Sequence, residues 1–240
     1  MRRLFLPFVV LAAVVLPLNA EAPSEYIKRF ENTYRKAATL RANFLEEYLE
    51  SGRVERVESG VAYFRRPGKM RWEYEAPEKN LFLIDGKTAW FYVPADHTVT
   101  RMPAKDSGDW RTPFALLAGK VKVSRICNKV ELEEKEQPAD ASLVVLSCEV
   151  RGAEKRREGE GGETFPEGTA PDLVQFELVR DTWELRKVVV HQRGGVQVKF
   201  EFKNWEFNPP VEEKKFHFAA PEGVAIVNGE AGSDGKSSER

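Results

Sequence analysis

The stretch from Phe64 to Pro103 contains short segments in which large apolar residues alternate with polar or charged ones. In residues 69–74 (KMRWEY) three apolar side chains alternate with three charged ones, which is the period of a strand with one buried face. Residues 81–84 (LFLI) are apolar throughout and lead into Asp85-Gly86, a dipeptide typical of two-residue hairpin turns. The pattern restricts this part of the chain to antiparallel β structure. Further strands are predicted at Thr88–Val93 and Thr98–Met102.

The rest of the chain adds strands and two short helices. Residues 23–40 have apolar side chains at helical spacing, with Ser24 as a candidate N-cap. Residues 112–119 (TPFALLAG) predict a short, almost wholly apolar helix, which must lie over an apolar surface. No βαβ alternation is present, so about ten strands predict a single antiparallel domain. Residues 42–50 fit both a helix and a strand, and their context favours a strand. Further strands are predicted at Val54–Arg65, Lys120–Lys135, Ala141–Arg151, Val174–Leu178, Leu185–His191 and Val196–Lys203.

The two ends of the chain differ in composition from its middle. Residues 1–20 combine two arginines, an apolar run and a small residue at Ala20, which predicts a cleavable signal peptide; an uncleaved anchor is the alternative. Residues 21–227 are predicted to form the domain, interrupted by a charged surface loop at 151–171. Residues 228–240 are predicted to be a disordered tail.

Cys127 and Cys148 flank a turn-like stretch at residues 136–140. If the segments on either side pair as a symmetric hairpin, the two thiols face each other across it. Export to an oxidising compartment then favours a disulfide. Two separate buried thiols are the alternative.

The residues of the chain argue against catalysis and against nucleic-acid binding. The chain has three histidines, His97, His191 and His217, without metal-type spacing, and it lacks the common nucleophile, phosphate and dinucleotide motifs. The formal net charge of −1 gives no global attraction to nucleic acid or to an anionic membrane. A binding protein without cofactor or metal is therefore expected.

Two features have both a structural and a functional interpretation. The structural interpretation of Arg66 is a charged residue in a turn. The functional interpretation is that the following proline restricts its backbone to an extended conformation, which fixes the direction of its side chain and of its five N–H donors toward carbonyls or a carboxylate. The apolar residues of 64–103 either fill a closed core or line a cavity, and periodicity alone cannot separate the two. These apolar residues include Met70, Trp72, Leu83, Trp90 and Tyr92.

Six short motifs occur in the order and spacing of one protein family. They are RP (66–67), DGKT (85–88), WFYVP (90–94), TPF (112–114), KFHF (215–218) and PEGV (221–224). With them the chain resembles the periplasmic outer-membrane lipoprotein carrier (LolA-like) family, from about Tyr26 to Val227. It departs from the family in the cysteine pair, the 151–171 insertion and the polar tail.

The resemblance implies a mainly β fold: an incomplete antiparallel β-barrel of about 10–11 strands with a short helical lid over an apolar cavity. It implies that Arg66 latches the lid through carbonyls near Tyr34, Leu117 and Ala118. Met70 takes a position that usually holds a bulky aromatic residue. The expected cavity wall comprises Met70, Trp72, Leu83, Trp90, Tyr92, Phe114 and Leu117.

The function that the resemblance implies is that of a periplasmic chaperone for lipoproteins, expected to act as a monomer. It would hold their acyl chains, take them from an ATP-driven (ABC-type) inner-membrane release complex and pass them to an outer-membrane receptor. Two alternatives stay open: a related transport protein for a glycolipid or other lipid, and a non-catalytic domain that senses lipoproteins.

Overall fold

The computed structural model describes residues 22–104, 112–119, 122–133, 140–151 and 171–229. The predicted signal peptide (1–20) lies outside these residues, as do most of the predicted loop (151–171) and tail (228–240).

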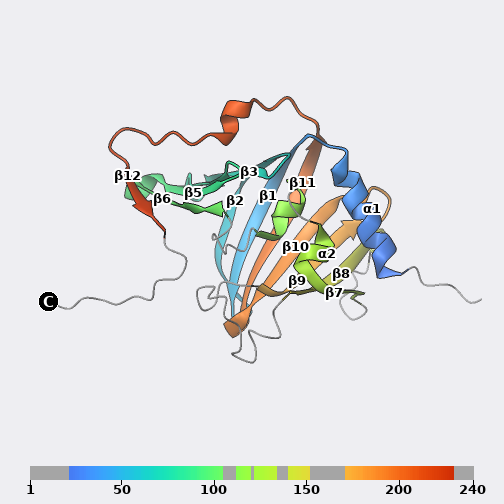
Figure 1. Cartoon of the computed structure of the whole chain (residues 1–240). Coiled ribbons are helices and arrows are strands. Elements are labelled where there is room, and N and C mark those ends of the chain that lie inside the picture. The colour runs from blue at the N-terminus through green and yellow to red at the C-terminus, as the bar shows by residue number, and fades with distance from the viewer. Residues whose placement is uncertain (1–21, 105–111, 120–121, 134–139, 152–170, 230–240) are drawn as a thin grey trace, which may run out of the picture.

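All the strands belong to one sheet (Figure 1), whose order is β12-β6-β5-β4-β3-β2-β1-β11-β10-β9-β8-β7. Neighbours are antiparallel except β12 and β6, which run parallel. The sheet is open, with β12 and β7 as its edges, so the predicted mainly β, incompletely closed fold is confirmed. The strands are β1 (Thr39–Glu50), β2 (Arg53–Arg65), β3 (Lys69–Ala76), β4 (Leu81–Ile84), β5 (Thr88–Val93), β6 (Thr98–Pro103), β7 (Cys127–Leu132), β8 (Leu143–Val150), β9 (Pro171–Val179), β10 (Leu185–Gln192), β11 (Val196–Phe207) and β12 (Ala225–Asn228).

Two strand details differ from the sequence prediction. The turn between β4 and β5 lies one residue later, because the Asp85 N–H donates to Thr88 O at 3.1 Å and leaves Gly86 and Lys87 as the turn. Gly86 has φ +108°, a conformation that favours glycine. β12 was not predicted, since an exposed four-residue strand carries too short a pattern to detect.

The sheet curves around its inner face, which α1, residues 112–119 and α2 cover (Figure 1). The helix α1 ends at Arg35 rather than Leu40, because Leu40 pairs in β1 with Phe64 and Phe207. Its N-cap is Ala22, not Ser24, and Pro23 takes the first turn, where its missing N–H costs nothing. Among the described residues no helix is long and apolar enough to span a membrane. The helices and 3₁₀ turns are α1 (Pro23–Arg35), η1 (Pro94–Asp96), η3 (Thr112–Leu116), α2 (Val123–Ile126), η4 (Arg193–Gly195) and η5 (Glu213–Phe216).

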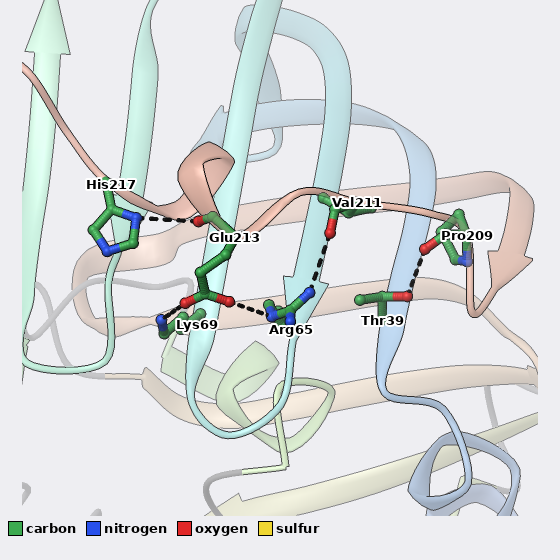
Figure 2. A network of polar contacts seen from close by, with 7 residues as sticks. All are labelled: Thr39, Arg65, Lys69, Pro209, Val211, Glu213 and His217. Carbon is green, nitrogen blue, oxygen red and sulfur yellow. Dashed lines mark hydrogen bonds and ion pairs between the residues drawn. The ribbon is translucent and has the colours of Figure 1, made fainter.

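The outer face of the sheet is crossed by residues 208–224, which we call the strap; it runs from the end of β11 to β12 (Figure 1). Figure 2 shows how it is held. Thr39 Oγ1 donates to Pro209 O at 2.8 Å, and Arg65 Nη1 donates to Val211 O at 3.1 Å. The Glu213 carboxylate accepts from Lys69 and lies 2.6 Å from Arg65 Nε, and these cations hold the pKa of Glu213 below its ordinary value.

A disulfide joins Cys127 of β7 to Cys148 of β8, 21 residues further along the chain. The two cysteines are not directly opposite, as a symmetric hairpin requires, because Cys127 pairs with Val150 and Cys148 with Val130. A register shift between Cys127 and Lys129 brings the two Cα atoms to 5.4 Å. The helical turn α2 also replaces the start of the predicted 120–135 strand.

Loss of this disulfide should destabilise the edge of the sheet. For a closed loop of this length, we expect reduction to lower the free energy of unfolding by about 3 kcal/mol, because the unfolded chain regains the entropy that the bridge removes. Urea titration with and without reductant measures the change. The double variant Cys127→Ser/Cys148→Ser is the control and should not respond to reductant. Identical titrations of the unaltered protein would contradict the expectation.

Candidate functional site

A cluster of buried aromatic residues lies where the lid meets the inner face. We use "lid" for α1 and residues 112–119. At its centre is Trp72 of β3, which is fully buried. Five phenylalanine rings surround its indole ring, with centroid distances of 4.9 Å for Phe44, 5.8 Å for Phe64, 5.1 Å for Phe114, 5.4 Å for Phe200 and 6.0 Å for Phe202.

The strands supply four of these rings because their registers align. Phe44 pairs with Phe202 across β1 and β11, and directly paired antiparallel residues share a face of the sheet. Trp72 pairs with Ala62, whose small side chain leaves room for the indole between neighbouring strands. The inner face thus presents a continuous aromatic surface from β3 to β11.

The lid supplies the fifth ring. Phe114 packs at 4.9 Å from Phe200 and 5.5 Å from Phe202, and Leu117 and Ala118 beside it have no exposed surface. At the other end of the lid, Phe30 of α1 lies 6.0 Å from Phe176 of β9. The lid is therefore closed onto the inner face.

Four of the predicted cavity residues come together here. Met70, Trp72, Phe114 and Leu117 are all buried in one apolar cluster, with Met70 beside Phe64 in the register of β2 and β3.

The other three lie elsewhere. Leu83 pairs with Arg71 and Trp90, so it faces away from Met70 and Trp72. Tyr92 pairs with Leu81, and Leu81 with Glu73, which places Tyr92 on the same outer face. Trp90 stacks on Phe218 of the strap at 5.1 Å, and Tyr92 also contacts Phe218. Leu83, Trp90 and Tyr92 therefore lie under the strap, not under the lid. They lie on the outer face because successive side chains of a pleated strand point to opposite faces of the sheet.

Arg66 lies between the lid and the sheet. Its Nη2 donates to Tyr34 O at the end of α1, at 3.0 Å, and its backbone N–H donates to Ala38 O at 3.0 Å. Residues 112–119 are held next to it, because the Gly68 N–H donates to Ala118 O at 2.9 Å. A methyl group added to Gly119 would overlap the Arg66 Nη1. Burial lowers the pKa of the Arg66 guanidinium, which nevertheless stays protonated at neutral pH.

Two donors under the lid have no acceptor: Trp72 Nε1 and Arg66 Nε. Burying a donor without a hydrogen bond costs about 1–3 kcal/mol. Such groups are rare in folded proteins and call for an explanation in each case.

Several residues of the site were not predicted from the sequence. Four of these residues belong to predicted strands: Phe44, Phe64, Phe200 and Phe202. The alternation within a single strand does not indicate which of its two faces carries a binding site. Glu46, a buried carboxylate that accepts from Tyr74 Oη at 2.6 Å, was also not predicted. Among the described residues, no three His, Cys, Asp or Glu side chains are grouped to hold a metal ion.

Comparison with known proteins points to one family. Residues 35–147 match the family model described as outer membrane lipoprotein carrier protein LolA. The chain is 32% identical over 226 residues to an outer-membrane lipoprotein carrier protein of Nitrosomonas europaea, covering 91% of this chain and 96% of that protein. It is 35% identical over 223 residues to the protein of the same description from Azotobacter vinelandii, with the same shares covered.

Among solved structures, an uncharacterized conserved protein from Thermus thermophilus superposes with a TM-score of 0.52 at 13% identity. The match covers 85% of this chain and 98% of that one. It supports the fold.

Replacement of Arg66 should loosen the lid. We expect Arg66→Leu to lose the hydrogen bond to Tyr34, worth about 1.5–3 kcal/mol for a charged donor, and to keep the sheet intact. Amide hydrogen exchange of Leu117, Ala118 and Gly119, whose N–H groups are bonded within the lid, should become about tenfold faster or more.

The neighbouring variant Arg65→Leu is the control, because Arg65 holds the strap instead. It should speed exchange at Lys215 and leave the lid amides unchanged. If amide hydrogen exchange in the lid is unchanged in Arg66→Leu, Arg66 does not hold the lid closed.

A second variant displaces the same arginine without removing it. Gly119 has φ +70°, so Gly119→Ala combines backbone strain of about 1 kcal/mol with a collision against Arg66. Gly52→Ala is the control, because Gly52 has φ +80° and open space around it. We expect faster lid exchange in Gly119→Ala alone. Equal lid exchange in the two variants would show that the collision has no effect.

Proposed function

The chain belongs to the LolA family of outer-membrane lipoprotein carrier proteins, and on that premise we propose that it holds lipoprotein acyl chains between its lid and the inner face of its sheet. Its function is that of a lipoprotein carrier, and carriers of this family are not catalytic. The observation that carries the proposed site is the ring cluster of Trp72, Phe44, Phe64, Phe200 and Phe202, which the lid residue Phe114 closes.

The energetics of acyl chains favour such a site. Each buried methylene contributes about 0.8 kcal/mol, so a chain of roughly 15 methylenes costs about 12 kcal/mol to expose to water. A lipoprotein therefore needs an apolar surface for every step through an aqueous compartment. Aromatic walls supply large apolar areas, and Met70 adds a flexible side chain that adapts to the shape of its contact.

In this proposal the closed lid occupies the acyl site. Phe114 and Leu117 make the contacts with the sheet that an acyl chain would make in the loaded state. Loading thus exchanges one set of apolar contacts for another, and the lid must swing away. The latch formed by Arg66 and Tyr34 is weak enough to open when cargo or a partner engages.

The family is periplasmic, which is consistent with a disulfide in this chain. The finer assignments complete the proposal: residues 1–20 direct export as a cleaved signal peptide, an ABC-type inner-membrane complex delivers the cargo, and an outer-membrane receptor removes it. The cargo binds as lipoprotein, through its acyl chains.

Native mass spectrometry of the protein isolated from the periplasm tests the cargo. We expect a bound acylated protein or peptide. Free glycolipid or phospholipid would instead assign the protein to lipid transport. A stable protein complex without lipid would favour a sensor of lipoproteins.

A transfer assay tests the lid's role. We expect Arg66→Leu to bind a lipid probe at least as tightly as the unaltered protein does, because the closed state that competes with the probe loses a hydrogen bond. It should transfer lipoprotein to outer-membrane vesicles several-fold more slowly, since a lid without this bond no longer drives the cargo out. Arg65→Leu is the matched control and should transfer normally. If Arg66→Leu transfers lipoprotein at the normal rate, the hydrogen bond between Arg66 and Tyr34 has no role in transfer.

A further inference from the structure

Trp72 combines complete burial with a polar atom that the closed structure leaves unused. Its Nε1 has no hydrogen-bond partner, whereas Trp90 Nε1 donates to Asp85 at 3.1 Å and Trp205 Nε1 donates to Leu185 O at 2.8 Å. The orphan donor of Trp72 lies at the centre of the proposed acyl site.

The surroundings of Trp72 do not account for this donor. Among the described residues, the rings within 6.0 Å of its centroid are all phenylalanine, and a phenyl face is a weak acceptor. A phenylalanine at residue 72 would extend the same aromatic surface without burying an N–H group. The indole therefore has a role in a state other than the closed one.

The lid determines when this donor can be reached. Phe114, whose ring centroid lies 5.1 Å from that of Trp72, belongs to the lid, so displacement of the lid uncovers one side of the indole. The molecule that replaces Phe114 then contacts Trp72 directly. An acyl chain attached through an ester or amide carries a carbonyl oxygen, which accepts a hydrogen bond; the hydrocarbon part of the chain does not.

We propose that Trp72 Nε1 donates a hydrogen bond to an ester or amide carbonyl of the bound acyl group, and so selects carbonyl-linked chains over plain hydrocarbon and sets how deep the chain lies. The inference rests on the proposed acyl site and adds a polar contact to it. Because the closed state leaves the donor unpaired and the loaded state pairs it, this contact favours the loaded state.

Two probes with matched chains test the proposal: dioctanoylglycerol, which has two ester carbonyls, and dioctylglycerol ether, which has none. We expect Trp72→Phe to weaken binding of the ester about fivefold and to change binding of the ether less than about twofold. Trp90→Phe is the control, because Trp90 lies under the strap, and it should change neither affinity. Equal losses for the two probes, or no loss for either, would overturn the inference and leave the acyl site standing.

The indole itself gives a second readout in the unaltered protein. The chain has five tryptophans, and the ¹⁵N indole resonance of Trp72 is identified by its contacts to the rings of Phe64 and Phe114. We expect the ester to shift its N–H proton downfield and the ether to leave it near its starting position. The same shift with both probes would contradict the hydrogen bond. Failure of the unaltered protein to bind either probe would overturn the acyl site and this inference together.

Discussion

Closure of the lid depends on the packing of Phe114 against Trp72, Phe200 and Phe202. A fully buried phenylalanine contributes about 1.5–3 kcal/mol, and the charged hydrogen bond from Arg66 contributes a similar amount. Both are small beside the cost of about 12 kcal/mol for an acyl chain of roughly 15 methylenes in water. In the proposed function, a lid of this strength keeps the aromatic surface covered when the site is empty and gives way to cargo.

The turn between β2 and β3 connects the lid to the strap. Its adjacent arginines point to opposite faces: Arg66 donates to Tyr34 of the lid, and Arg65 to Val211 of the strap. The chain between α1 and β1 joins the same turn, since the Ala38 carbonyl accepts from the Arg66 backbone N–H, and Thr39 Oγ1 at the start of β1 donates to Pro209 of the strap. The lid on the inner face and the strap on the outer face are thus both held at the same end of the sheet, where β1 begins and β2 ends.

Alternation within strands was enough to predict most of the sheet. β3, β5 and β10 were located almost to the residue, because each alternates or is bounded by turn residues. The helix at 23–40 was predicted too long, since Leu40 fits a helical apolar stripe and a strand equally well. The site prediction placed Leu83 on the wrong face because all four residues of β4 are apolar. Such a pattern does not indicate that Phe82 faces the lid and that Leu83 faces the strap.

Periodicity and turn chemistry are local properties, so the mainly β fold, the apolar character of residues 114–118 and the position of Arg66 before a proline could all be predicted from the sequence. Which aromatic residues meet the lid follows from the three-dimensional fold. Trp72 and Trp90 look alike in the sequence, yet one lies under the lid with an unused donor and the other lies under the strap with its donor bonded to Asp85. The difference arises from register between neighbouring strands, which depends on residues far apart in the chain.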